Sequence, residues 1–235
     1  MQSPPPATAR ATHVRYWVIV FAVTLAIIQF IDRVCISQAA PSISRDLKLD
    51  KAQMGWVFAA FTLAYGLFEI PAGYLGDRIG PRKVLLRIVL WWSFFTVATG
   101  WVRSWTSLFV TRFLFGAGEA GGFPNLTKAF NRWLPPRERA REQGVMWLSV
   151  RLGGAFTPLL VFACLQFVSW RTAFLLFGLL CVVWAVLFYR WYRDDLHAHQ
   201  SVNAAEAECC RRKPARAGII KRRGGNSSTR EPSGA

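Results

Sequence analysis

The chain has 235 residues, of which 53% are hydrophobic, and a formal net charge of +16. Its mean hydropathy is +0.24, and its apolar residues form long blocks instead of the short periodic runs of a soluble core. These features exclude soluble folds and indicate a polytopic membrane protein. The sequence shows no nucleophile motif, no metal spacing among its five cysteines and no phosphate loop, so we expect neither an enzyme nor a cofactor or metal site.

Six apolar blocks are long enough to cross a membrane, which takes about 20 residues. They cover residues 16–39, 54–75, 84–102, 107–129, 144–168 and 172–191. We therefore predict an all-α membrane protein with six transmembrane helices. The expected domains are a disordered cytoplasmic leader at 1–13, the six-helix domain at 14–192 and a basic, disordered cytoplasmic tail at 193–235.

The distribution of positive charge predicts the topology. Most loop lysines and arginines follow the second and fourth blocks, whereas the turns after the third and fifth hold only Arg103 and Arg171. Because basic loops stay in the cytoplasm, both termini are expected there. The membrane topology thus accounts for the net charge of +16. Because the basic tail also lacks the aromatic residues that stack on nucleic-acid bases, we expect no nucleic-acid partner.

Polar residues interrupt the second half of the first block, at Gln29, Asp32 and Arg33, and the helix is expected to end at Pro41. The fourth block brings Arg112 to a depth similar to that of Asp32. We therefore predict an ion pair between these two residues, which would lower the cost of burying both.

Tyr65 and Glu69 are four residues apart in the second block and share one helix face. Each has two interpretations. Tyr65 lines a cavity or simply packs between helices, and Glu69 faces the cavity or is a solvated carboxylate at the helix end.

The turn between the second and third blocks reads Gly73-Tyr-Leu-Gly-Asp-Arg-Ile-Gly-Pro-Arg-Lys83. Its glycines permit a tight reversal, and Asp77 can cap the following helix or pair with an arginine. We predict that this turn acts as a gating loop. The residues assigned to it are Gly73, Asp77, Arg78, Gly80, Arg82 and Lys83.

The fourth block contains Arg112 and Glu119, which lie on nearly one helix face about 10 Å apart along the axis. A charge at a membrane-helix centre costs roughly 2.5–3.5 kcal/mol, so such residues usually mark an ion or substrate path. The alternative is a buried structural ion pair with glycine-assisted packing. Pro124 is expected to weaken the last turns of this helix.

The later segments carry less information. The basic connection 131–141 either fixes topology or binds anionic lipid, and Arg151 in the fifth block either lines a cavity or reaches the membrane surface. The sixth block, 172–191, is expected to be apolar, lipid-facing support. Because the first and fourth blocks both carry buried charges, we predict two inverted three-helix repeats.

Together these stretches resemble the major facilitator superfamily, and within it the anion:cation symporters that include galactonate, glucarate and hexuronate permeases. The resemblance covers residues 14 to about 206, and the 73–83 turn is its strongest signal. The other matching stretches are Asp32-Arg33 with Ile36–Pro41, Arg112–Pro124, Glu138–Gly144 and Arg151–Ala155.

The resemblance implies proton-coupled symport of an organic anion, such as a sugar acid, across the bacterial inner membrane. It implies that Asp32 and Glu119 carry the proton and that Arg112 tracks their protonation. The implied substrate contacts are Arg33, Tyr65 and Gln29. A carboxylate in an apolar interior favours protonation and a nearby arginine opposes it, so a substrate that competes for the arginine can couple its binding to proton uptake.

The chain departs from the family in length, since the family has twelve helices and this sequence shows the first six. Residues 201–206 still resemble the central linker, whereas the Arg/Gly/Pro/Ser-rich sequence from Cys209 resembles a shifted reading frame of a GC-rich gene. We therefore expect an interrupted gene. The alternatives are a transport-inactive remnant and a half-transporter that works only with a second copy or with a separate C-terminal half.

Overall fold

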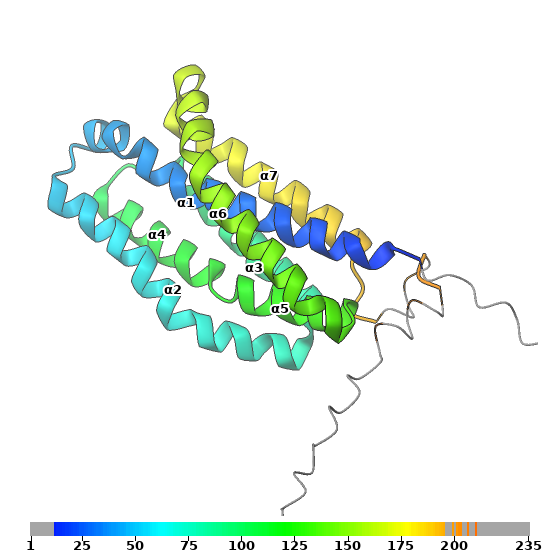
Figure 1. The fold of residues 1–235 in the computed structure, drawn as a ribbon. Coiled ribbons are helices and arrows are strands. Elements are labelled where there is room, and N and C mark those ends of the chain that lie inside the picture. Colours follow the sequence, from blue (N-terminus) through cyan, green and yellow to red (C-terminus); the bar gives the residue numbers. More distant parts are fainter. Residues whose placement is uncertain (1–11, 196–198, 200, 204–205, 207–209, 211–235) are drawn as a thin grey trace, which may run out of the picture.

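The computed structural model describes residues 12–195, 199, 201–203, 206 and 210, and the regular structure in this part of the chain is helical. Figure 1 shows an elongated bundle of helices that run roughly side by side. The elements are the 3₁₀ turn η1 (Val14–Tyr16) and the helices α1 (Trp17–Leu47), α2 (Lys51–Ile79), α3 (Pro81–Thr99), α4 (Trp105–Glu119), α5 (Gly122–Trp133), α6 (Pro136–Phe167) and α7 (Trp170–Trp191).

Four helices of the described chain are long and apolar enough to cross a membrane: α1 with η1, α2, α6 and α7. Helix α3 and the α4–α5 pair lie alongside them. The bundle is built from three main contacts, α1 with α6, α2 with α4, and α3 with α7. The described segments before α1 and after α7 lie at the same end of the bundle, which we call the terminus end (Figure 1).

The predicted fourth helix, 107–129, is two helices. Helix α4 ends at Glu119 and α5 begins at Gly122, because Gly121 between them has φ +84, a conformation that favours glycine. A Cβ atom at Gly121 would lie 2.5 Å from the Cβ of Ala72 on α2. The expected weak point, Pro124, lies in the first turn of α5, where a proline is tolerated.

Helix α1 does not end at Pro41, as the sequence predicted, but continues to Leu47. Buried Ala39 and Ile43 on either side of the proline pack into the core and keep the helix continuous. The helix ends instead at Lys48, whose φ of 53 is left-handed. Asp50 then starts α2 with a capping box to Gln53.

The predicted 73–83 loop is mostly helix as well. Helix α2 extends to Ile79, Gly80 with φ +85 makes the reversal, and Pro81 is the first residue of α3. Asp77 does not cap α3. Its carboxylate instead pairs with Lys128 of α5, at 2.7 Å between Oδ1 and Nζ.

The chain beyond α7 contacts the terminus end, although we expected a disordered tail from residue 193. Glu206 is fully buried, and Arg15 joins it to Glu138 on α6 through distances of 3.4 Å and 3.2 Å. The His199 ring lies 5.4 Å from the Trp133 ring. The proposed frame change from Cys209 onward falls almost entirely outside the described residues.

Candidate functional site

Four polar side chains are buried in the middle of the bundle. Gln29 and Asp32 come from α1, and Arg112 and Glu119 from α4, with exposed fractions between 0% and 2%. Helical spacing places each pair on one face of its helix, and the sequence correctly predicted that Asp32, Arg112 and Glu119 are buried. Arg33 joins this cluster from the edge of α1.

The ion pair in this cluster joins Arg33 and Glu119. Arg33 Nε lies 2.6 Å from Glu119 Oε1, and the glutamate is fully buried whereas the arginine side chain is 25% exposed. The predicted Asp32–Arg112 pair is not formed. Adjacent residues of a helix point about 100° apart, and in α1 the arginine, not the aspartate, faces α4's last residue.

Arg33 also lies against aromatic rings. Its guanidinium carbon is 4.7 Å from the centre of the Tyr65 ring, 5.2 Å from that of Phe61 and 5.9 Å from that of Phe30. Such contacts stabilise a cation without neutralising it. Tyr65 therefore faces the site and does not merely pack between helices.

Two hollows meet at Arg33. The larger, of 520 Å³, is lined by Phe30, Arg33, Tyr65, Glu69, Phe123, Pro124, Thr127, Trp147, Val150 and Arg151. The smaller, of 190 Å³, is lined by Arg33, Ile36, Ser37, Val57, Phe58, Phe61, Thr62, Arg112 and Phe115. Arg33 is the residue that both share, and both Glu69 and Arg151 face the larger hollow.

Asp32 has a different environment from the one expected. Its Oδ2 accepts a hydrogen bond from Cys181 Sγ at 3.1 Å, and Trp92 Nε1 donates to the same sulfur at 3.3 Å. Cys181 lies on α7, which we expected to be plain support, and Trp92 on α3. No sequence signal could have found this contact, because a single cysteine in an apolar run has no pattern.

Arg112 is held by an alcohol and two rings. Its Nη2 donates to Thr99 Oγ1 at 2.7 Å, and its guanidinium carbon lies 4.7 Å from the centre of the Phe115 ring and 5.1 Å from that of the Phe174 ring. Within the described chain, Arg112 forms no hydrogen bond or ion pair with Asp32.

The cluster contains unpaired polar atoms. Within the described part of the chain, six buried side-chain atoms of these residues have no hydrogen-bond partner. They are Gln29 Nε2 and Oε1, Asp32 Oδ1, Arg33 Nη2, Arg112 Nε and Glu119 Oε2. Buried polar atoms are nearly always paired, so this concentration makes the cluster the candidate site.

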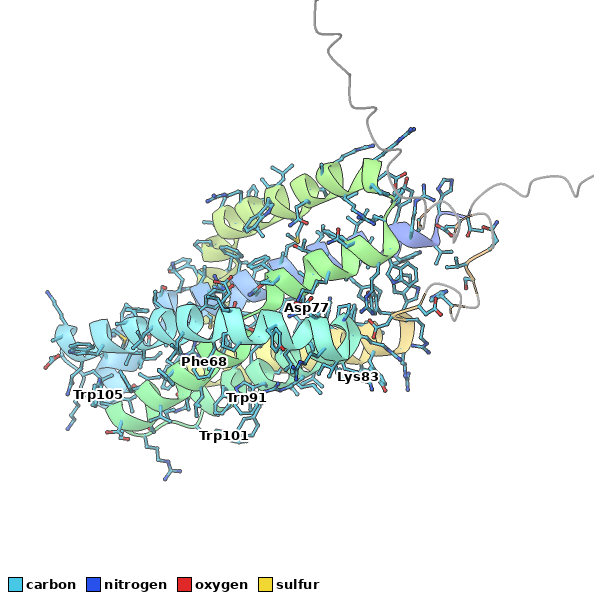
Figure 2. All side chains as sticks on the ribbon, turned by 90° about the horizontal axis from the view of Figure 1, so that it is seen from below. Phe68, Asp77, Lys83, Trp91, Trp101 and Trp105 are labelled. Atoms are coloured by element: carbon cyan, nitrogen blue, oxygen red, sulfur yellow. The ribbon has the colours of Figure 1, made fainter. Side chains whose placement is uncertain are left out.

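The predicted gating residues lie away from this cluster, toward the terminus end. Figure 2 shows Asp77 and Lys83 nearer that end, whereas Trp101 and Trp105 lie at the opposite end. Arg82 donates its backbone N–H to Asp194 and its side chain to the Tyr189 carbonyl, at 3.2 Å and 2.6 Å. The Arg78 guanidinium carbon lies 4.9 Å from the centre of the Tyr74 ring.

Residues 22–228 match the family model of the Major Facilitator Superfamily. The chain belongs to this superfamily. The resemblance inferred from the sequence is thereby confirmed, and the chain covers the N-terminal half of the superfamily fold.

Several curated superfamily members are similar to this chain. It is 40% identical over 181 residues to the "Probable sulfoacetate transporter SauU" of Cupriavidus necator, covering 77% of this chain and 42% of that protein. It is 34% identical to the hexuronate transporter of Bacillus subtilis, over 75% of this chain and 42% of the relative. The chain thus spans less than half the length of these relatives, which are named as transporters and not as enzymes.

A solved structure has the same fold. It is that of a bacterial homolog to the human lysosomal transporter Spinster, in an inward-facing and occupied conformation. The TM-score is 0.67 at 24% identity, and the match covers 78% of this chain and 45% of that one.

Proposed function

We propose that this chain forms the N-terminal, six-helix half of a proton-coupled symporter for a small organic anion such as a sugar acid. The observation that carries the proposal is the state of Arg33. Its Nε is paired with buried Glu119, while the side chain as a whole is 25% exposed and lines two hollows. An anionic group in the larger hollow can therefore reach a cation that is already neutralised from the other side.

The six-helix arrangement is supported by helix lengths and packing. Helix α3 has 19 residues, enough for about 28 Å, and α4 followed by α5 provides a broken fourth crossing. The first three crossings are α1, α2 and α3, and the second three are α4–α5, α6 and α7. If the two sets are exchanged in order, the α1–α6 contact becomes the α4–α2 contact, and the α3–α7 contact is unchanged. This pattern is expected of two inverted repeats.

The substrate class follows from the chemistry of Arg33. A guanidinium binds carboxylate or sulfonate oxygens through parallel N–H groups, and Tyr65 places a hydroxyl on the same hollow. The relatives are named for sulfoacetate and hexuronate, which are anions of this kind. Gln29 is buried beside Gly122 and lines neither hollow, so its role as a substrate contact stays a prediction from the family resemblance.

The coupling step is an exchange of partners at Arg33. When the anion binds the guanidinium, Glu119 loses the cation that neutralises it inside an apolar environment. A carboxylate in that position takes up a proton. Asp32 provides a second buried carboxylate, and Arg112 interacts electrostatically with both acids.

In this proposal the inner membrane is crossed with both termini in the cytoplasm, so the terminus end is the cytoplasmic end. The Asp77–Lys128 ion pair and the Gly80 reversal lie toward that end and act as its gate. The larger hollow would open and close there.

The test measures proton uptake on anion binding. The purified chain is mixed with glucuronate, galactonate or sulfoacetate in weak buffer containing a pH indicator. We expect binding with uptake of about one proton, binding without proton uptake in Glu119→Gln, and no binding in Arg33→Gln. Glu69→Gln, which removes a carboxylate from the same hollow, is the matched control and should behave as the wild type.

Other outcomes separate the alternatives. Absence of anion binding, both alone and after co-expression with the C-terminal half of a relative, would indicate a transport-inactive remnant and refute the proposal. Accumulation of the anion by the chain alone in proteoliposomes, together with a cross-linked dimer, would indicate a self-pairing half-transporter. Uphill accumulation retained in both Asp32→Asn and Glu119→Gln would exclude the assigned proton sites.

A further inference from the structure

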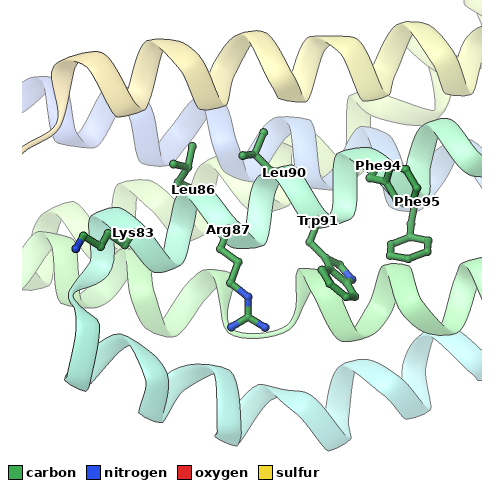
Figure 3. Close-up of a pocket in the computed structure, with 7 residues that line it drawn as sticks. All are labelled: Lys83, Leu86, Arg87, Leu90, Trp91, Phe94 and Phe95. Atoms are coloured by element: carbon green, nitrogen blue, oxygen red, sulfur yellow. The ribbon is translucent and has the colours of Figure 1, made fainter.

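A third hollow, separate from the two at Arg33, lies on the outer face of α3, away from the buried cluster. Its volume is 640 Å³, and its lining residues are Lys83, Leu86, Arg87, Leu90, Trp91, Phe94 and Phe95. Figure 3 shows Leu86 and Leu90 projecting from one side of the helix, and Arg87 and Trp91 from the other. The two rows of side chains are each spaced by four residues, so they form parallel ridges with a groove between them.

The groove has a cationic end and an apolar end. Lys83 and Arg87 lie in the first two turns of α3, at the terminus end, and the residues from Leu90 onward are apolar. Among the described residues that line the groove, none is acidic. Neither base forms an ion pair or a side-chain hydrogen bond within the described chain, and both are exposed.

Two acids toward the terminus end, Asp77 and Asp194, are paired with other bases. Asp77 lies 2.7 Å from Lys128, and Asp194 lies 2.9 Å from Arg132. Lys83 and Arg87 are therefore left as uncompensated positive charges beside an apolar surface. An exposed Arg78 lines the neighbouring hollow, which also includes Arg87 and Trp91.

The dimensions of the groove match one leaflet of a bilayer. From Lys83 to Phe94 the helix rises about 16 Å, and half of the hydrocarbon thickness is about 15 Å. Trp91 is fixed in the groove wall, since its Nε1 donates to the Leu114 carbonyl at 2.9 Å. It also occupies the space that Gly118 leaves free, where a Cβ atom would lie 1.9 Å from Trp91 Cδ1.

We propose that this groove binds one anionic phospholipid of the leaflet at the terminus end. Its phosphate lies between Lys83 and Arg87, and one acyl chain runs along Leu90 and Phe94. The positive charge selects an anionic headgroup, and the length and apolar character of the groove select a long acyl chain. This site is independent of the anion site at Arg33.

The test uses native mass spectrometry of the delipidated chain in detergent. The protein is titrated with phosphatidylglycerol or phosphatidylcholine that carry the same palmitoyl and oleoyl chains. We expect one phosphatidylglycerol to bind about 30-fold more tightly than phosphatidylcholine, since each base near a membrane surface contributes about a factor of five. Lys83→Gln combined with Arg87→Gln should remove this preference.

The matched control is Arg137→Gln combined with Arg190→Gln. These arginines are also exposed, lie near the same end and form no ion pair in the described chain, so the variant loses the same charge outside the groove. It should keep the preference. Equal binding of both lipids, or an equal loss in both double variants, would overturn the proposal.

Two further measurements identify what occupies the groove. Dihexanoyl phosphatidylglycerol and inorganic phosphate should compete poorly with the long-chain lipid, and full competition by either would refute a site that holds an acyl chain. The same spectra report oligomers. A dimer that is lost in the Lys83/Arg87 variant and excludes phosphatidylglycerol would show that a second copy covers the groove, which also refutes the proposal.

Discussion

Arg33 Nε and Glu119 Oε1 lie 2.6 Å apart although the two residues are 86 positions apart in the sequence. The contact joins α1 to the last residue of α4, just before the helix is interrupted at Gly121. It is also the point at which a buried acid, an exposed edge of an arginine and two hollows meet. The stability and the proposed coupling of the molecule therefore depend on the same pair.

Removing one partner of this pair should be strongly destabilising. Removing one member of a fully buried ion pair lowers the free energy of unfolding by about 3–5 kcal/mol. For Glu119→Ala we expect a loss of about 2–3 kcal/mol, because Arg33 is partly exposed. Thermal unfolding in detergent measures the effect. The double variant Arg33→Ala/Glu119→Ala should lose less stability than the sum of the losses in the two single variants. A loss equal to that sum would show that the two side chains do not stabilise each other.

Gly116 on α4 should not tolerate a side chain. A Cβ atom there would lie 2.6 Å from the backbone oxygen of Phe61 on α2, so Gly116→Ala should separate the two helices and cost about 1–3 kcal/mol. Gly66→Ala is the control, because nothing lies within 4 Å of that position and alanine favours a helix. An unchanged melting temperature for Gly116→Ala would contradict the close approach of α2 and α4.

Gly121 should be sensitive for two separable reasons. Alanine at φ +84 costs about 1–2 kcal/mol, and its Cβ would also lie 2.5 Å from that of Ala72. Gly121→Ala should therefore lower the melting temperature, and adding Ala72→Gly should restore only the part that comes from the contact. Complete recovery in the double variant would mean that the backbone conformation is not strained.

Contact of the chain after α7 with the bundle should depend on pH through His199. Burial, together with the nearby Arg193 charge, lowers the pKa of His199 below its ordinary value. The folded state therefore favours the neutral ring, so contact with Trp133 is strongest above about pH 6.5 and weakens as the pH falls below it.

Carbon-13 NMR of labelled histidine measures this pKa directly, with His199→Gln identifying the signal. We expect the His199 signal to titrate below that of a histidine in an unfolded peptide. Titration at or above the peptide value would be incompatible with the contact between His199 and the aromatic rings.

The sequence predicted which charges are buried more reliably than how they pair. Apolar blocks interrupted by Asp32, Arg112 and Glu119 required a protected polar site, because each charge is costly in an apolar environment. Which charges pair depends on how α1 is rotated about its axis and on the helix break at Gly121. A rotation of α1 by one residue position, about 100°, would point Asp32 instead of Arg33 at Glu119. Periodicity cannot fix a rotation of that size.

Other parts of the site were beyond sequence reasoning for a related reason. Thr99 contacts Arg112 because α3 packs on α4, and Cys181 contacts Asp32 because α7 packs on α1. Neither Thr99 nor Cys181 belongs to a recognisable pattern. Helix ends were also poorly predicted. Pro41 and Pro124 are strong local signals for a helix end, yet packing and position in the helix make both tolerable.

The guanidinium of Arg33 is the side chain that the two hollows have in common. Under the proposed function, a ligand in either hollow would therefore act on the same ion pair with Glu119. A single buried contact would then report occupancy of both hollows to the end of α4, where the helix breaks at Gly121.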